Sequence, residues 1–133
     1  MKRALIALVL AATTAGTSGA HADARSLILT CEKAITAARV GPAPASSSAL
    51  TRARAAEAKC EASGHMANLM LEHKGDKAIH DASYAYAALE VGVVDYVRYC
   101  GNITSSHTLA VLHRAEREIA QGRSEAKQAL AEL

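Results

Sequence analysis

The sequence contains no Phe and no Trp, and only four Tyr among its 133 residues. A core without these large rings must be filled by Leu, Ile, Val, Met and abundant Ala. Alanine lets helices approach closely but buries little area, and apolar burial is worth about 25 cal/mol per Å². We therefore expect a chain of this size to need further stabilisation from a disulfide or a partner.

Proline is scarce as well, and both prolines lie in the segment Gly41-Pro42-Ala43-Pro44. No segment alternates apolar and polar residues for long enough to predict a strand, and no internal repeat is found. Apolar residues instead recur every three or four positions, which predicts helices over about 24–40, 49–72, 76–100 and 105–133. Helices without strands predict an all-α fold, and the short connections between them favour antiparallel neighbours. This fold is a small antiparallel bundle of about four helices in a single domain, residues 23–133.

Glycines interrupt two of the predicted helices. Gly64 in the second helix is typical either of a kink or of a close approach by another backbone, and Gly122 is a weak point in the fourth. The third helix has the most regular apolar stripe, from Ile79 to Cys100. Residues 101–106 after it combine a glycine suited to a helix C-cap with hydroxyl residues suited to an N-cap. The buried stripe of the second helix is expected at Ala53, Ala56, Cys60, Ala67 and Met70 or Leu71.

The first 22 residues have the organisation of a signal peptide. Lys2 and Arg3 precede a short apolar run, and Ala20-His21-Ala22 matches an Ala-x-Ala cleavage site. The apolar run is too short to span a bilayer, so we expect cleavage rather than the alternative, a retained membrane anchor. The mature chain would begin at Asp23 and lie in the periplasm.

After this cleavage the chain has no formal net charge. Removal of the two basic residues of the signal segment leaves 13 basic residues against 13 acidic ones. A nucleic-acid partner would favour a basic surface, and an anionic membrane would do the same. We therefore expect no nucleic-acid partner, and no membrane association after cleavage.

Only three cysteines are present, Cys31, Cys60 and Cys100, and each lies on the apolar stripe of its own predicted helix. An oxidising compartment favours one disulfide and leaves one thiol over. Convergence of the three stripes on one core leaves all three pairings open. A leftover Cys31 is expected to be a buried, inert thiol rather than a nucleophile.

Residues that carry chemistry show no catalytic or metal-binding pattern. No two histidines are four apart on a helix, and Cys-x-x-Cys-His is missing, so no metal or haem cofactor is expected. Asp76 and His80 are four apart, which is typical of a surface pair near a helix N-terminus. The four tyrosines of the third helix either cover the edges of the bundle or form an interface. The most polar turn contains the candidate partner-binding residues, namely Glu72, His73, Lys74, Asp76 and Lys77.

Three segments together carry a resemblance to a known family. They are Leu27-Ile28-Leu29-Thr30-Cys31, Cys60 with Gly64, and Cys100-Gly101-Asn102-Ile103-Thr104-Ser105-Ser106-His107-Thr108-Leu109. In cysteine placement and in the turn followed by a hydroxyl-capped helix, the chain resembles the Rap/Tai family of type VI secretion amidase immunity proteins. The resemblance extends over most of the chain after residue 22.

The resemblance implies a periplasmic inhibitor without catalytic residues. Its partner would be a secreted peptidoglycan amidase effector, which it would block by occlusion, and a homodimer is an expectation because family members often act as dimers. With this resemblance we also expect a Cys60–Cys100 disulfide between the second helix and the corner of the third and fourth helices. Alternatives are a holdase-like periplasmic stress protein or a small cofactor-binding bundle.

Overall fold

The computed structural model describes residues 2–41, 46–101 and 108–133, and the side chains of the first helix from residue 19 onward. The described residues form five α-helices and contain no strand. An all-α bundle is therefore confirmed. The helices are α1 (Lys2–Ala38), α2 (Ser47–Lys59), α3 (Ser63–Glu72), α4 (Lys77–Gly101) and α5 (Thr108–Glu132).

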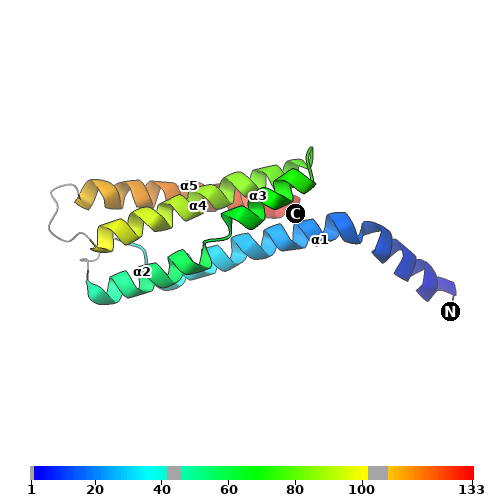
Figure 1. Cartoon of the computed structure of the whole chain (residues 1–133), viewed down its shortest axis with the longest axis horizontal. Helices are drawn as coiled ribbons and strands as arrows, with labels where there is room; N and C mark the ends of the chain where they lie inside the picture. Colours follow the sequence, from blue (N-terminus) through cyan, green and yellow to red (C-terminus); the bar gives the residue numbers. More distant parts are fainter. Residues whose placement is uncertain (1, 42–45, 102–107) are drawn as a thin grey trace.

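The helices alternate in direction along the chain. Figure 1 shows α2 and α3 following one another in the same direction, so that together they take the place of one long helix. This pair runs opposite to α1, α4 returns beside it, and α5 runs back along α4. The arrangement is the predicted antiparallel bundle, with its second helix in two pieces.

The prediction of one continuous helix over 49–72 is wrong, because the helix is interrupted between Lys59 and Ser63. The N–H of Cys60 still donates to carbonyls of α2, but three residues, 60–62, separate the end of α2 from the start of α3. The hydroxyl of Tyr86 on α4 accepts the N–H of Ala62 at 2.9 Å. This bond satisfies a backbone donor at the start of α3, where the helix itself supplies no acceptor.

The break also changes which side of α3 faces the core. Met66 and Leu69 are buried, whereas Ala67 and Leu71, which an uninterrupted helix would have buried, are exposed. Gly64 is not a point of close backbone approach, since a Cβ built on it meets nothing within 4 Å, and the interruption falls before it, at residues 60–62. The interruption therefore shifts the helical phase by about one residue.

The core is centred on α4, whose predicted stripe is confirmed. Its residues from Ile79 to Cys100 at three- and four-residue spacing are buried, and α1, α2 and α3 pack on one side of it. The most extensive contact of α4 is with α5. Gly92 and Gly122 make this contact close. A Cβ on Gly122 would lie 2.9 Å from the backbone N of Leu89, and one on Gly92 would lie 3.1 Å from that of Ile119.

The disulfide joins Cys31 of α1 to Cys60 after α2, with their Cα atoms 4.7 Å apart. The expected Cys60–Cys100 pairing is wrong. Cys100 lies at the end of α4 and packs with Ala49 and Ala53 near the start of α2, whereas Cys60 lies beyond the other end of that helix. The free thiol is therefore Cys100. It is buried, and burial raises its pKa, although Tyr96 and Arg52 oppose that shift.

Two other expectations concern regions at the edge of the described structure. The turn and caps predicted over 101–106 lie outside the described residues, apart from Gly101 at the end of α4. The predicted signal segment belongs to α1, whose first part projects past the rest of the bundle in Figure 1. Among the described helices, none is both long and apolar enough to cross a membrane.

The close contact of α4 with α5 predicts that Gly→Ala substitutions inside this contact lower stability, whereas a Gly→Ala substitution outside it raises stability. Gly92→Ala and Gly122→Ala each force the two backbones apart and should lower the free energy of unfolding by roughly 1–3 kcal/mol. Gly64→Ala in open space should instead raise it by up to about 1 kcal/mol, because alanine favours helix. Urea denaturation followed by circular dichroism measures all three. Equal effects at the three glycines would contradict this packing.

The disulfide predicts the cysteine chemistry of the oxidised protein. Non-reducing peptide mapping should yield the Cys31–Cys60 peptide, and Cys31→Ala/Cys60→Ala should lower stability by about 2–4 kcal/mol. Dithiothreitol should destabilise the Cys100→Ala variant as strongly as the wild type, because Cys100 carries no disulfide. Loss of this sensitivity in Cys100→Ala would show that the wrong pair has been assigned.

Candidate partner-binding surface

The turn between α3 and α4 has a conformation set by its own backbone. The N–H of His73 donates to the carbonyl of Leu69 at 3.0 Å and closes α3. Gly75 has φ +86°, a value that favours glycine, and the N–H of Asp76 then donates to the carbonyl of His73 at 3.1 Å. The chain reverses direction in four residues and enters α4.

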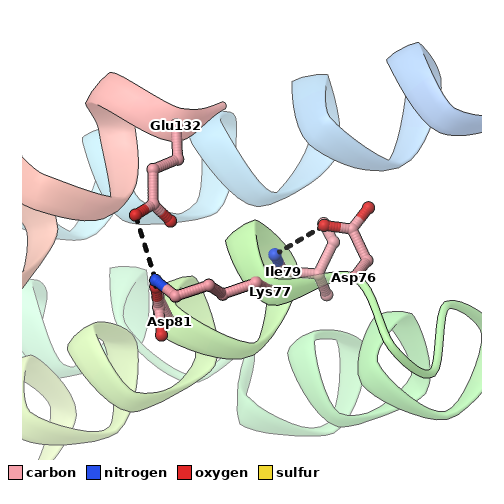
Figure 2. A network of polar contacts seen from close by, with 5 residues as sticks. All are labelled: Asp76, Lys77, Ile79, Asp81 and Glu132. Carbon is pink, nitrogen blue, oxygen red and sulfur yellow. Dashed lines mark hydrogen bonds and ion pairs between the residues drawn. The ribbon is translucent and has the colours of Figure 1, made fainter.

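Asp76 fixes the start of α4 and contacts α1. Its carboxylate accepts the N–H of Ile79 at 3.3 Å, as Figure 2 shows, which is the bond of a helix N-cap. Its other oxygen lies 2.8 Å from Nε2 of His21. Burial opposes ionisation of Asp76, but the bonds from His21 and Ile79 outweigh it and lower the pKa of the carboxyl. Because His21 precedes the predicted cleavage site, its contact belongs to the uncleaved chain.

Lys77 connects the first turn of α4 to the end of α5. Its Nζ lies 2.7 Å from the carboxylate of Asp81 and 3.2 Å from that of Glu132, on the opposite helix (Figure 2). Hydrogen bonds to Asp81 and then Glu132 raise the pKa of this ammonium. Lys77 is well exposed, so its pairs orient the turn more than they stabilise the bundle.

A surface hollow of about 500 Å³ lies beside this turn. Four of the five predicted partner-binding residues line it, and Glu72 is exposed next to it. Asp76 and Lys77 are engaged within the bundle, whereas the described structure shows no ion pair for Glu72, His73 or Lys74. The hollow is lined by Met70, Leu71, His73, Lys74, Gly75, Asp76, Lys77 and His80.

The sequence did not single out the apolar and aromatic part of this surface. Leu71 is 64% exposed at the end of α3, although it was an option for the buried stripe. Tyr84 is 61% exposed on α4, and its ring meets that of His80 edge-on with centroids 4.8 Å apart. The sequence suggested a surface pair of Asp76 and His80. In the structure the ring of His80 contacts Tyr84, while the carboxylate of Asp76 binds His21 and the backbone N–H of Ile79. The other three tyrosines are buried, so only Tyr84 favours an interface.

A separate group of perturbed ionisable residues lies between α4 and α5. Asp95 is only 3% exposed, and Arg114 binds both its oxygens through Nε at 3.0 Å and a terminal nitrogen at 3.2 Å. Arg98 adds a bond of 3.2 Å. A buried carboxylate needs such donors, because desolvation without them is costly. Sequence periodicity offered no signal for Asp95, which interrupts an apolar helix face.

Glu118 shares this site with Asp95. Burial and the adjacent Asp95 carboxylate raise the pKa of Glu118 to about 7. For Asp95, burial acts in the same upward direction, but hydrogen bonds from Glu118 and Arg114 outweigh it and lower its pKa. Glu118 is therefore a proton-sharing partner of an ionised Asp95 at neutral pH. The pair is held by arginines at a helix interface, which is a structural arrangement.

Neither metal ligation nor similarity to known proteins identifies a site. Within residues 2–41, 46–101 and 108–133, no group of three or more His, Cys, Asp or Glu side chains is arranged to hold a metal ion. No protein-family model, no curated protein and no solved structure matches the chain.

The shared proton predicts a specific pH dependence of stability. The folded state keeps a proton on Glu118 that the unfolded state releases, so this contribution is complete below pH 4.5 and lost as pH rises through about 7. The free energy of unfolding of Glu118→Gln, measured relative to that of the wild type, should therefore rise by roughly 1 kcal/mol from pH 4.5 to about pH 8, allowing for solvent screening.

Urea denaturation at each pH measures this difference, and groups that titrate equally in both proteins cancel. Glu116→Gln, on the same helix, is the matched control for the loss of a carboxylate. A Glu118→Gln difference that stays constant from pH 4.5 to about 8 would show that Glu118 is ionised throughout.

Proposed function

We propose that this protein is a periplasmic inhibitor that binds a secreted peptidoglycan amidase and occludes its active site without chemistry of its own. The observation that carries the proposal is the surface around the α3–α4 turn, where exposed Leu71 lines a hollow bordered by charged residues and exposed Tyr84 packs against His80 of the same hollow. Apolar and aromatic side chains within a charged rim are the usual anatomy of a protein interface. The amidase as partner comes from the family resemblance.

The turn suits occlusion because its conformation is set before binding. Asp76 caps α4, Gly75 supplies the reversal, and Lys77 joins the turn to Glu132 of α5. A partner that contacts this turn orders few additional torsions, which lowers the entropic cost of association. His73 and Lys74 then supply charge or hydrogen-bond donors at the rim.

The compartment is part of the proposal. The signal segment directs export, and a Cys31–Cys60 disulfide persists in an oxidising environment such as the periplasm. There the chain would meet an amidase delivered by a neighbouring cell. A homodimer remains compatible with this role, because steric occlusion needs only one exposed turn from each copy.

The first test mixes the chain from Asp23 onward with candidate amidase effectors of the same genome. Complex mass by light scattering and residual peptidoglycan amidase activity are recorded together. A stoichiometric complex with lost activity is the expected result. Leu71→Asp should weaken the complex by at least about tenfold, because it places a charge in the apolar centre of the interface. Lys74→Glu should chiefly slow association.

Leu109→Asp is the matched control. Leu109 is 63% exposed, almost the same as Leu71, but it begins α5 at the other end of the bundle. Binding should therefore be unchanged. An equal loss in both variants would point to altered folding or a different interface. Absence of any complex would reject the inhibitor, and assays for client aggregation at low pH or a visible absorption band would then test the stress-protein and cofactor alternatives.

A further inference from the structure

A second hollow, of about 460 Å³, lies between α1 and α2 and shares no residue with the hollow beside the α3–α4 turn. Its floor consists of alanine methyl groups from the two helices, and Ala37 and Ala55 are exposed. Its rim is basic, with Lys33 from α1 and Arg52 and Lys59 from α2. The lining residues are Thr30, Lys33, Ala34, Ala37, Ala38, Arg52, Ala55, Ala56 and Lys59.

Among the residues that the structure describes, none of the three cations of this groove forms an ion pair. The described part of the chain shows no ion pair for Lys33 or Lys59, and both are exposed. Arg52 donates to the hydroxyl of Ser48 at 2.7 Å, and its Nε is buried without an acceptor. Three uncompensated positive charges around an apolar floor favour a ligand that is negative at its edges and apolar between them.

The groove is held in shape by the disulfide. Cys31 lies between Thr30 and Lys33 of one wall, and Cys60 follows Lys59 of the other, with their Cα atoms 4.7 Å apart. This bond sets the separation of α1 and α2 at one end of the groove. A binding surface whose walls cannot separate loses less entropy when it is occupied.

The dimensions and the floor favour a helix as the occupant. Along α1 the lining runs from Thr30 to Ala38, about 12 Å or two helical turns. Methyl groups alone provide a shallow floor, on which a helix with small side chains can lie closely but which cannot enclose an acyl chain. The acidic residues Glu57, Glu61 and Glu90 of the chain line a hollow themselves, so they do not form a ridge that fits this groove.

We propose that the α1–α2 groove binds an acidic amphipathic helix of a partner protein. Small apolar residues of that helix lie on the alanine floor, and its Asp or Glu side chains pair with Lys33, Arg52 and Lys59. This is the helix-in-groove mode of recognition. The proposal does not rest on amidase inhibition, because the groove is formed by other elements than the α3–α4 turn.

A labelled peptide tests the proposal on the oxidised chain from Asp23 onward. The probe is a fluorescein-tagged helix of about 18 residues, long enough to hold helical structure, with an Ala/Leu stripe flanked by Glu. A matched peptide carries Lys in place of each Glu. Fluorescence anisotropy should show saturable binding of the Glu peptide, weakening as salt rises, with the Lys peptide at least about tenfold weaker.

Variants of the protein then test whether the peptide binds in the groove. Lys33→Glu/Lys59→Glu should weaken binding of the Glu peptide by at least about tenfold, and Ala37→Tyr should weaken it by filling an exposed part of the floor. Lys127→Glu, an exposed lysine on α5, is the charge control and should leave binding unchanged. Circular dichroism confirms that each variant is folded.

Four results would overturn the proposal. The first is equal binding of the two peptides, and the second is binding that Lys33→Glu/Lys59→Glu leaves intact. The third is stoichiometric binding of dodecanoate without peptide binding, which would assign the groove to an anionic amphiphile. The fourth is a concentration-dependent dimer that competes with the peptide and is lost in the double variant, which would make a second copy the occupant.

Discussion

The contact between α4 and α5 depends on two glycines that allow the helix backbones to meet. Any side chain at Gly122 would enter the space of Leu89, and one at Gly92 would enter that of Ile119. In a chain without Phe or Trp, this proximity replaces large side chains as a source of close packing. It also buries Asp95, which can stay ionised there because Arg98 and Arg114 reach it from the two helices. The remaining helices, α1, α2 and α3, each pack against α4.

The other two constraints act on the opposite side of the bundle. The Cys31–Cys60 bond fixes α1 against the end of α2, and the hydroxyl of Tyr86 fixes the start of α3 against α4. Both lie at the interruption between α2 and α3, so the break is held by covalent and hydrogen bonds. A buried disulfide and a buried hydroxyl together supply what a small alanine-rich core lacks.

Periodicity predicted the helices and most of their buried faces, because burial along a regular helix repeats with its geometry. The main apolar stripe of α4, from Ile79 to Cys100, could be predicted, although Asp95 and Tyr99 are buried beside it. Three features could not. The break after Lys59 depends on an acceptor from Tyr86, 24 residues away, and it rotates α3 so that Leu71 is exposed. The cysteine pairing depends on which ends of α2 meet α1 and α4, and spacing along the chain does not encode this. The hollow beside the turn was predicted only in its polar half, since its apolar half follows from the break.

The two candidate surfaces arise from different physical causes, and this bears on what each can do. The α3–α4 turn presents large side chains on a pre-set reversal, so it can enter a cavity of another protein. The α1–α2 groove presents small side chains between cations on walls joined by a disulfide, so it can receive a helix. Each surface borders a hollow, and the two hollows share no lining residue. A protein that blocks an enzyme with its turn can therefore hold a second segment along its groove, because the rigid bundle between them separates the two contacts.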